Sequence, residues 1–208
     1  MDGRASSSVV AGRASLDNQS PPLAVPASGR VRILGVDPGS RFTGYGIIDF
    51  ETNHAAHIHS GTIKVKADNL AGKLRVIFDA LGEIMDEHRP DEFAIERVFM
   101  HRNADSALKL GQARGAALLA ASSRDVPVFE YSPNAIKQSV TGRGHAAKQQ
   151  IQHMIKVLLC LSVEPQTDCA DALAVAMTHG HIRQSLNRLA DAGDGVKSST
   201  KPKAGSGA

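Results

Sequence analysis

The sequence predicts an α/β fold in which helices flank a mixed five-stranded sheet. Short apolar runs alternate with longer segments whose apolar residues recur at helical spacing. Short turns join the first three runs, which favours an antiparallel meander. A helical segment then separates the third run from the fourth, and such a crossover allows the fourth strand to lie parallel to the first. The pattern alone also permits other three-layer α/β folds.

The strands are expected at five apolar runs: 31–36, 44–50, 56–65, 93–96 and 126–131. Helices are expected over 70–88, which Pro90 closes, and over 103–123, 146–161 and 167–183. Another helix should begin at Ser132-Pro133, with the serine as N-cap and the proline in the first turn.

The chain has 208 residues, of which 42% are hydrophobic and 22% charged, a composition that fits one globular domain with tails. Residues 30–187 form the predicted domain. Residues 1–29 and 188–208 are rich in small and polar residues without apolar periodicity, so we expect disordered tails there. A transit peptide is the alternative for the first tail, and Asp2 and Asp17 weaken it.

Composition also restricts where the protein works. No apolar run reaches the roughly 18 residues of a membrane-spanning helix, so we expect a soluble protein without a membrane partner. Cys160 and Cys169 lie in apolar runs and form no CxxC pair, which predicts buried, reduced thiols and a cytoplasmic setting. The net charge of +3 permits a polyanionic partner without arguing for one.

Four acidic residues occupy positions that suggest a metal site. Asp37 and Glu96 each follow an apolar strand, and the carboxyl ends of parallel strands meet at one edge of a sheet. Asp168 and Asp171 share one face of an apolar helix, where two like charges are unfavourable unless a cation lies between them. Oxygen ligands alone favour Mg²⁺ or Mn²⁺, and two such ions about 4 Å apart can hydrolyse phosphodiesters.

Each of these acids also has an ordinary structural explanation. An aspartate after a strand is often a turn or cap residue, as Asp37 would be. Glu96 could end its strand in a salt bridge, and Asp168 and Asp171 could be an N-cap and an exposed surface acid. The combination of all four is more specific than any one of them.

Several strings in the sequence closely resemble the bacterial RuvC family of Holliday-junction resolvases. They are ILGVDPGSRFTGYGII, FAIERVFMHRNADSALKLGQARGAALLAA, PVFEYSPNAIKQSVTGRGHAAKQQIQHM and DCADALAVAMTH, which together span about 30–183. The resemblance implies a ribonuclease-H-like fold and a homodimer that nicks four-way DNA junctions symmetrically with Mg²⁺. It implies that the catalytic and metal-binding acids are Asp37, Glu96, Asp168 and Asp171, and that the RuvA–RuvB branch-migration complex is a partner.

DNA contacts are expected next to the acids. Arg97 and Arg102 follow Glu96 closely and could meet phosphates. Phe99, between them, could stack on an unpaired base or wedge into a base step, a role that the resemblance supports. Lys137 and Lys148 flank the loop TGRGH and, by the resemblance, would bind the backbone and stabilise charge on the cleaved phosphate, with Arg143 nearby. The alternatives are a Phe99 packed beneath its own loop and solvated lysines on helix faces.

Other interpretations remain at this point. The DPGS-x-x-TG string also resembles the first phosphate loop of actin-like sugar kinases and ATPases, although only one such lobe is present. A non-catalytic junction-binding protein is another possibility, against which all four acids argue. His179 and His181 are expected at a helix terminus rather than in a metal site, because no zinc-like spacing occurs. The helix over 103–123 is a candidate dimer interface, unless it only packs on its own sheet.

Overall fold

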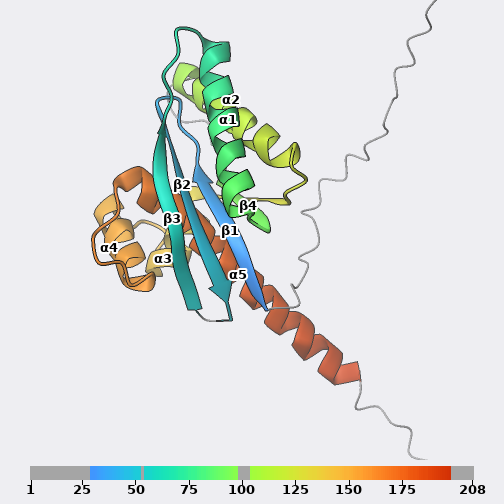
Figure 1. Cartoon of the computed structure of the whole chain (residues 1–208). Coiled ribbons are helices and arrows are strands. Elements are labelled where there is room, and N and C mark those ends of the chain that lie inside the picture. Colours follow the sequence, from blue (N-terminus) through green and yellow to red (C-terminus); the bar gives the residue numbers. More distant parts are fainter. Residues whose placement is uncertain (1–28, 53, 98–103, 198–208) are drawn as a thin grey trace, which may run out of the picture.

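A computed structural model describes residues 29–52, 54–97 and 104–197, and it contains one mixed sheet with helices on both faces (Figure 1). The strand order is β3-β2-β1-β4-β5. The first three strands pair antiparallel, whereas β4 pairs parallel with β1, and β5 parallel with β4. Their bounds are β1 Arg30–Asp37, β2 Phe42–Glu51, β3 His54–Lys64, β4 Glu92–Glu96 and β5 Val128–Tyr131. The predicted fold class, including the parallel crossover, is confirmed.

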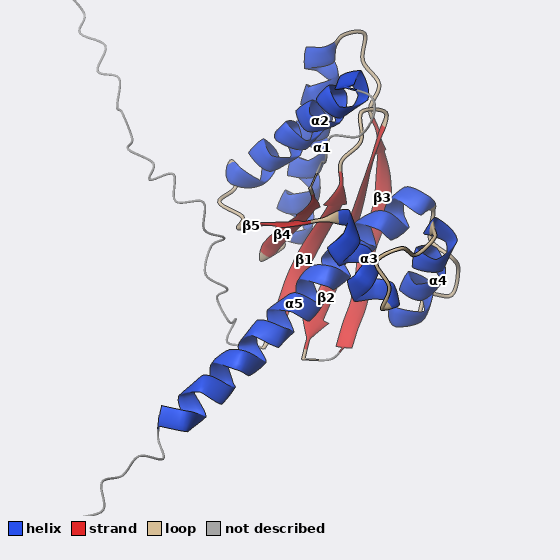
Figure 2. Ribbon diagram, turned by 180° about the vertical axis from the view of Figure 1, so that it is seen from behind, coloured by secondary structure: helices blue, strands red, loops and turns tan. Residues whose placement is uncertain are grey.

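The helices form two layers. Helices α1 (Leu70–His88) and α2 (Ala104–Ser122) pack together on one face of the sheet. Helix α5 (Thr167–Lys197) lies across the other face, with α3 (Pro133–Thr141) and α4 (Lys148–Leu158) beside it (Figure 2). Helix α5 extends beyond the end of the sheet in both views.

Local chemistry fixes several helix ends. The Asn69 side chain accepts a hydrogen bond from the Gly72 amide at the start of α1, and Arg89 ends that helix in the left-handed conformation. The Ser132 hydroxyl accepts from the Ala135 amide, so the predicted N-cap of α3 is confirmed. Caps of this kind satisfy amides that a helix leaves unpaired in its first turn.

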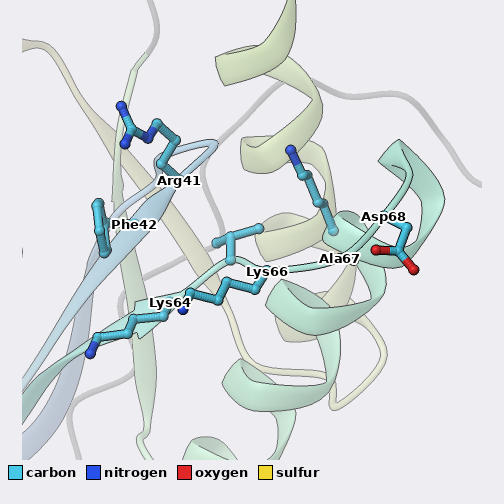
Figure 3. A pocket seen from close by; sticks show the side chains of 8 residues that line it. Arg41, Phe42, Lys64, Lys66, Ala67 and Asp68 are labelled. Atoms are coloured by element: carbon cyan, nitrogen blue, oxygen red, sulfur yellow. The ribbon is translucent and has the colours of Figure 1, made fainter.

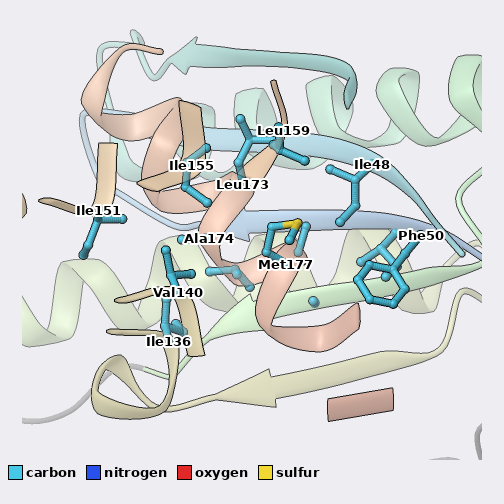
Figure 4. Packing of buried hydrophobic residues seen from close by; sticks show 14 of the residues in the cluster. Ile48, Phe50, Ile136, Val140, Ile151, Ile155, Leu159, Leu173, Ala174 and Met177 are labelled. Carbon is cyan, nitrogen blue, oxygen red and sulfur yellow. The ribbon is translucent and has the colours of Figure 1, made fainter. Parts of the chain in front are cut away.

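Apolar side chains form one core on each face of the sheet. On the α5 face, Ile151 and Ile155 of α4 and Leu173 of α5 pack with Ile48 and Phe50 of β2 (Figure 4). On the other face, side chains of β1, β4, α1 and α2 meet, and alanines form the buried stripe of α2: Ala113, Ala116, Ala117, Ala120 and Ala121. Small side chains let α2 approach the sheet and α1 closely.

A buried polar network ties α5 to the first residue of β4. His179, fully buried, has its Nε2 2.6 Å from Glu92 Oε2 and its Nδ1 2.6 Å from the Tyr131 hydroxyl. Arg183 donates to Glu92 Oε1 at 2.7 Å. The prediction that His179 and His181 mark a helix terminus is therefore wrong: the helix continues past both, and tertiary hydrogen bonds account for the buried His179.

The structure differs from the sequence-based expectations in other respects. Helix α5 runs on to Lys197, into the segment predicted as a C-terminal tail, and no proline interrupts residues 184–197. Helix α4 is shorter than predicted, ending at Leu158.

The two cysteines differ in exposure. Cys160, beyond the end of α4, is exposed rather than buried as predicted, whereas Cys169 is buried as expected. Residues 1–28 and 198–208 lie outside the described residues, so their interpretation as tails stays a prediction.

Within the described ranges, no helix combines the length and the apolar character that crossing a membrane requires.

We predict that Glu92→Ala destabilises the protein by about 3–5 kcal/mol, because it removes a buried carboxylate that accepts hydrogen bonds from a buried guanidinium and pairs with a buried imidazole. Chemical denaturation measures the free energy of unfolding. Asp79→Ala is the control, since it breaks an exposed i,i+4 pair with Arg75 and should cost little. Equal losses in the two variants would contradict a structural role for the network.

Candidate active site

The parallel pairing of β1 and β4 brings two carboxylates together. Asp37 is the last residue of β1, and Glu96 is the last residue of β4. The register pairs Val36 with Ile95, so the two acids that follow lie at the same edge of the sheet. Both are partly buried. The convergence expected from the two strand ends is therefore present.

Helix α5 brings the other two acids to the same edge. It begins at Thr167, so Asp168 lies in its first turn and Asp171 one turn further on. The helix packs almost directly on the strand backbones: a Cβ added at Gly44 would lie 2.0 Å from the Asp168 carbonyl oxygen, and one at Gly35 2.2 Å from that of Ala172. Gly44 is the pairing partner of Asp37, so the start of α5 lies beside the end of β1.

The carboxylates lie close enough to perturb one another. Burial first, and then the negative charges of Glu96, Asp171 and Asp168, together raise the pKa of Asp37 to about 7, against a smaller lowering effect of Lys148. Burial is also the main cause of the raised pKa values of Glu96 and Asp171, and Asp171 adds to the effect on Glu96. Crowded carboxylates of this kind favour a bound cation or proton between them.

Two lysines from the neighbouring helices supply positive charge. Lys148, the first residue of α4, has its Nζ 3.7 Å from Asp171 Oδ2. Lys137 of α3 and Lys148 both act to lower the pKa values of Glu96 and Asp171, against the effect of burial. The Gln150 side chain accepts a hydrogen bond from the Ala147 amide and so fixes the start of α4, where Lys148 lies. The positive charges of Lys137 and Lys148 thus offset part of the repulsion among the acids.

The donor set suits a hard divalent cation, since it offers only carboxylate oxygens. Across residues 29–52, 54–97 and 104–197, however, no three acidic, histidine or cysteine side chains close on a common point tightly enough to coordinate an ion. The four acids therefore share a region of the surface and influence one another's charge, while their oxygens do not converge on one position.

Comparison with known proteins places this site in a family. The family model described as crossover junction endodeoxyribonuclease RuvC matches residues 33–179, a range that contains all four acids. The chain belongs to the RuvC family.

RuvC proteins with similar sequences include those of Shewanella sp. (strain W3-18-1), 58% identical over 157 residues, and of Photorhabdus laumondii subsp. laumondii, 54% identical over 159 residues. The match covers 76% of this chain in both cases, and 91% and 92% of the respective relatives. It supports a crossover junction endodeoxyribonuclease and not the kinase-like alternative.

Solved structures agree with the fold. Thermus thermophilus RuvC in complex with a Holliday junction substrate is 33% identical, with a TM-score of 0.69, over 74% of this chain and 96% of that one. The yeast mitochondrial Holliday junction resolvase Ydc2 superposes with a TM-score of 0.54 over 76% of this chain and 84% of its own. At 11% identity, Ydc2 supports the fold alone.

The structure places only some of the predicted DNA-binding residues of this RuvC protein. Arg97 is exposed and lies 3.4 Å from Glu130, and Arg143 is exposed in the loop after α3, where it lines a surface depression of about 480 Å³. Phe99 and Arg102 lie outside the described residues, so their roles stay predictions.

Sequence reasoning missed the contacts that hold the site together. The glycines of β1 and β2 that admit α5 were not singled out, although a glycine inside a strand is a known sign of close backbone approach. The Thr43 hydroxyl, which donates to the Gly39 carbonyl at 3.0 Å and lies 3.2 Å from the Gly39 amide, closes the loop after Asp37. The approach of α5 to the glycines depends on the tertiary fold, whereas the contact of Thr43 with Gly39 is local.

We predict that Gly44→Ala lowers junction nicking on the order of 100-fold, because its methyl group displaces the start of α5 and small misplacements of catalytic groups are costly. The matched control is Gly180→Ala, which forces α5 against the Phe50 ring at the other end of the sheet, far from the acids.

Thermal midpoints and single-turnover nicking rates are measured for both glycine variants. Both should lose stability, and only Gly44→Ala should lose most of its activity. A loss of activity that follows stability equally in both variants would show that Gly44 does not position the acids.

Proposed function

We propose that this RuvC protein resolves four-way DNA junctions by metal-dependent nicking of two strands related by symmetry, during recombination and repair. The observation that carries the proposal is the gathering of Asp37, Glu96, Asp168 and Asp171 at one edge of the sheet, with the pKa of Asp37 raised to about 7. A phosphodiester nuclease needs such a concentration of negative charge to hold cations beside a polyanionic substrate.

Asp37, Glu96, Asp168 and Asp171 are the residues proposed to hold two Mg²⁺ ions, with Mn²⁺ as a substitute. Bound divalent ions would supply an activated water and stabilise the leaving oxygen. The acids have room to adjust, because Asp168 and Asp171 are only partly buried and lie near the start of their helix. Relief of the repulsion among the four acids would favour their convergence on a cation.

Lys137 and Lys148 are proposed to bind the phosphate backbone next to the acids and to stabilise charge on the cleaved phosphate. Lys148 suits this role because its side chain is 74% exposed while its ammonium reaches Asp171. Arg143 and Arg97, both exposed, would add phosphate contacts on either side. Phe99 and Arg102 complete the proposed DNA surface, with Phe99 stacking on a base exposed by the junction.

A homodimer is proposed, because a junction presents two equivalent strands and α2 carries a suitable surface. One face of α2 is exposed and built from small and apolar residues: Ala104, Leu108, Gly111, Gly115 and Leu119. A Cβ at Gly111 or Gly115 would meet nothing within 4 Å, so packing within the described chain gives no reason for either glycine. Close approach of α2 from a second copy of the chain would explain both glycines.

The wider setting is also proposed. A cytoplasmic location fits two free cysteines, Cys160 and Cys169. The RuvA–RuvB branch-migration complex, which the family resemblance implies, would deliver the junction.

We predict that each of Asp37→Asn, Glu96→Gln, Asp168→Asn and Asp171→Asn abolishes nicking of a synthetic four-way junction in Mg²⁺. Each should retain gel-shift affinity for the junction, because the basic surface is untouched. Each should be at least as stable as the parent in EDTA, because one repelling charge is gone. Glu83→Gln, an exposed α1 change, is the control. Full activity in any amide variant would remove that residue from the catalytic set.

We predict that Leu119→Glu converts a dimer to a monomer at micromolar concentration without lowering the thermal midpoint of the monomer. Leu119 is 60% exposed in the single chain, so a buried charge arises only if a partner covers it. Val157→Glu, at 55% exposure on α4, is the matched control and should leave the mass unchanged. Sedimentation measures the mass, and a parent protein that is already monomeric would contradict the dimer.

A further inference from the structure

A second group of basic side chains lies at the same end of the sheet as the acids, where the start of β2, the end of β3 and the start of α1 meet. Arg41 precedes β2, Lys64 ends β3, Lys66 follows it, and Lys73 belongs to α1. They line a depression of about 570 Å³ (Figure 3). We call these four residues the β3-side basic surface.

The sheet topology fixes the relation of this surface to the acids. Gly44 pairs with Asp37 on one side and with Thr62 on the other, so β3 lies two strands away from Asp37. Neighbouring strands are about 5 Å apart, which makes the lateral offset about 10 Å. That is roughly three nucleotides of a DNA strand at 3.4 Å each along the helix axis.

The surface is rigid where it meets the active-site loop. The Val65 amide donates to the Arg41 carbonyl at 3.0 Å, and Phe42 pairs with Lys64 in the β2–β3 ladder. These hydrogen bonds connect the loop after Asp37 to the end of β3. Asp37 and the basic side chains therefore belong to the same hydrogen-bonded sheet. Phe42, 45% exposed, lines the same depression and lies between Arg41 and Lys64 in Figure 3.

The charges of this surface are not neutralised by the protein. Arg41, Lys64 and Lys66 are exposed, and none of the four cations has an ion-pair partner among the residues that the structure describes. One carboxylate, Asp68, also lines the depression, and Figure 3 shows it apart from Arg41 and Lys64, towards α1. Four cations against one acid leave a net positive surface suited to a polyanion.

We propose that the β3-side basic surface binds the phosphate backbone of the junction strand that continues past the cleaved phosphate, opposite the arm held by Lys137, Arg143 and Lys148. This proposal rests on the proposed function. The acids would then lie between two basic surfaces, so a strand bound by both is held across the site. Phosphate contacts fix the register of a nucleic acid on a protein in this way.

The test is the salt dependence of junction binding by Lys64→Ala/Lys66→Ala, measured in EDTA. Loss of two phosphate contacts should reduce the slope of log affinity against log salt by about 1.8. Between 50 and 200 mM salt, the parent should therefore lose about 12-fold more affinity than the variant. Arg75→Ala/Lys156→Ala removes the same charge elsewhere and should keep the parent slope.

An unchanged slope and affinity in the Lys64/Lys66 variant would overturn the proposal, as would an equal reduction in the control. Unaltered thermal midpoints establish that both variants fold. Nicking by the parent is followed on the same junction in Mg²⁺: its absence would overturn the proposed function, whereas the slope in EDTA tests the surface independently.

Discussion

The close approach of α5 to the backbones of β1 and β2 is the constraint on which the site depends. Two acids belong to strands and two to a helix, and only direct helix–strand packing puts them in one region. Gly35 and Gly44 make this possible, since any side chain there would overlap the helix backbone. The same contact buries Leu173 and its neighbours against β2, so core packing and site geometry come from one interface.

This helix–strand interface also brings the carboxylates close enough to repel one another. Packing α5 on the strands partly buries Asp37, Glu96 and Asp171, and burial is the largest cause of each raised pKa. Lys148 offsets part of this by lying near Asp171, but its exposed side chain can turn to a phosphate. A site that is unfavourable when empty of cations gains most from binding them, which suits metal-assisted hydrolysis.

The middle of α5 is held by a different kind of contact. Hydrogen bonds in the interior join His179 and Arg183 of α5 to Glu92, and His179 to Tyr131. Because such bonds require specific geometry, they fix α5 along its axis. Glu92 and Glu96 are the two ends of β4: the first anchors the helix and the second belongs to the site. Strand β4 thus connects the buried hydrogen-bond network at Glu92 to the candidate active site at Glu96.

The order of the elements, the parallel crossover and the placement of four acids at two strand ends and on one helix could be predicted from the sequence, because apolar periodicity and strand-end position are local properties. It also predicted the Ser132 cap, which depends on residues three apart. The role of His179 and the exposure of Cys160 became clear only from the packed fold. It alone brought Arg41, Lys64, Lys66 and Lys73 to one surface. These features depend on which segments distant in sequence pack together, and a pattern read along the chain carries no information on the distance between two such segments.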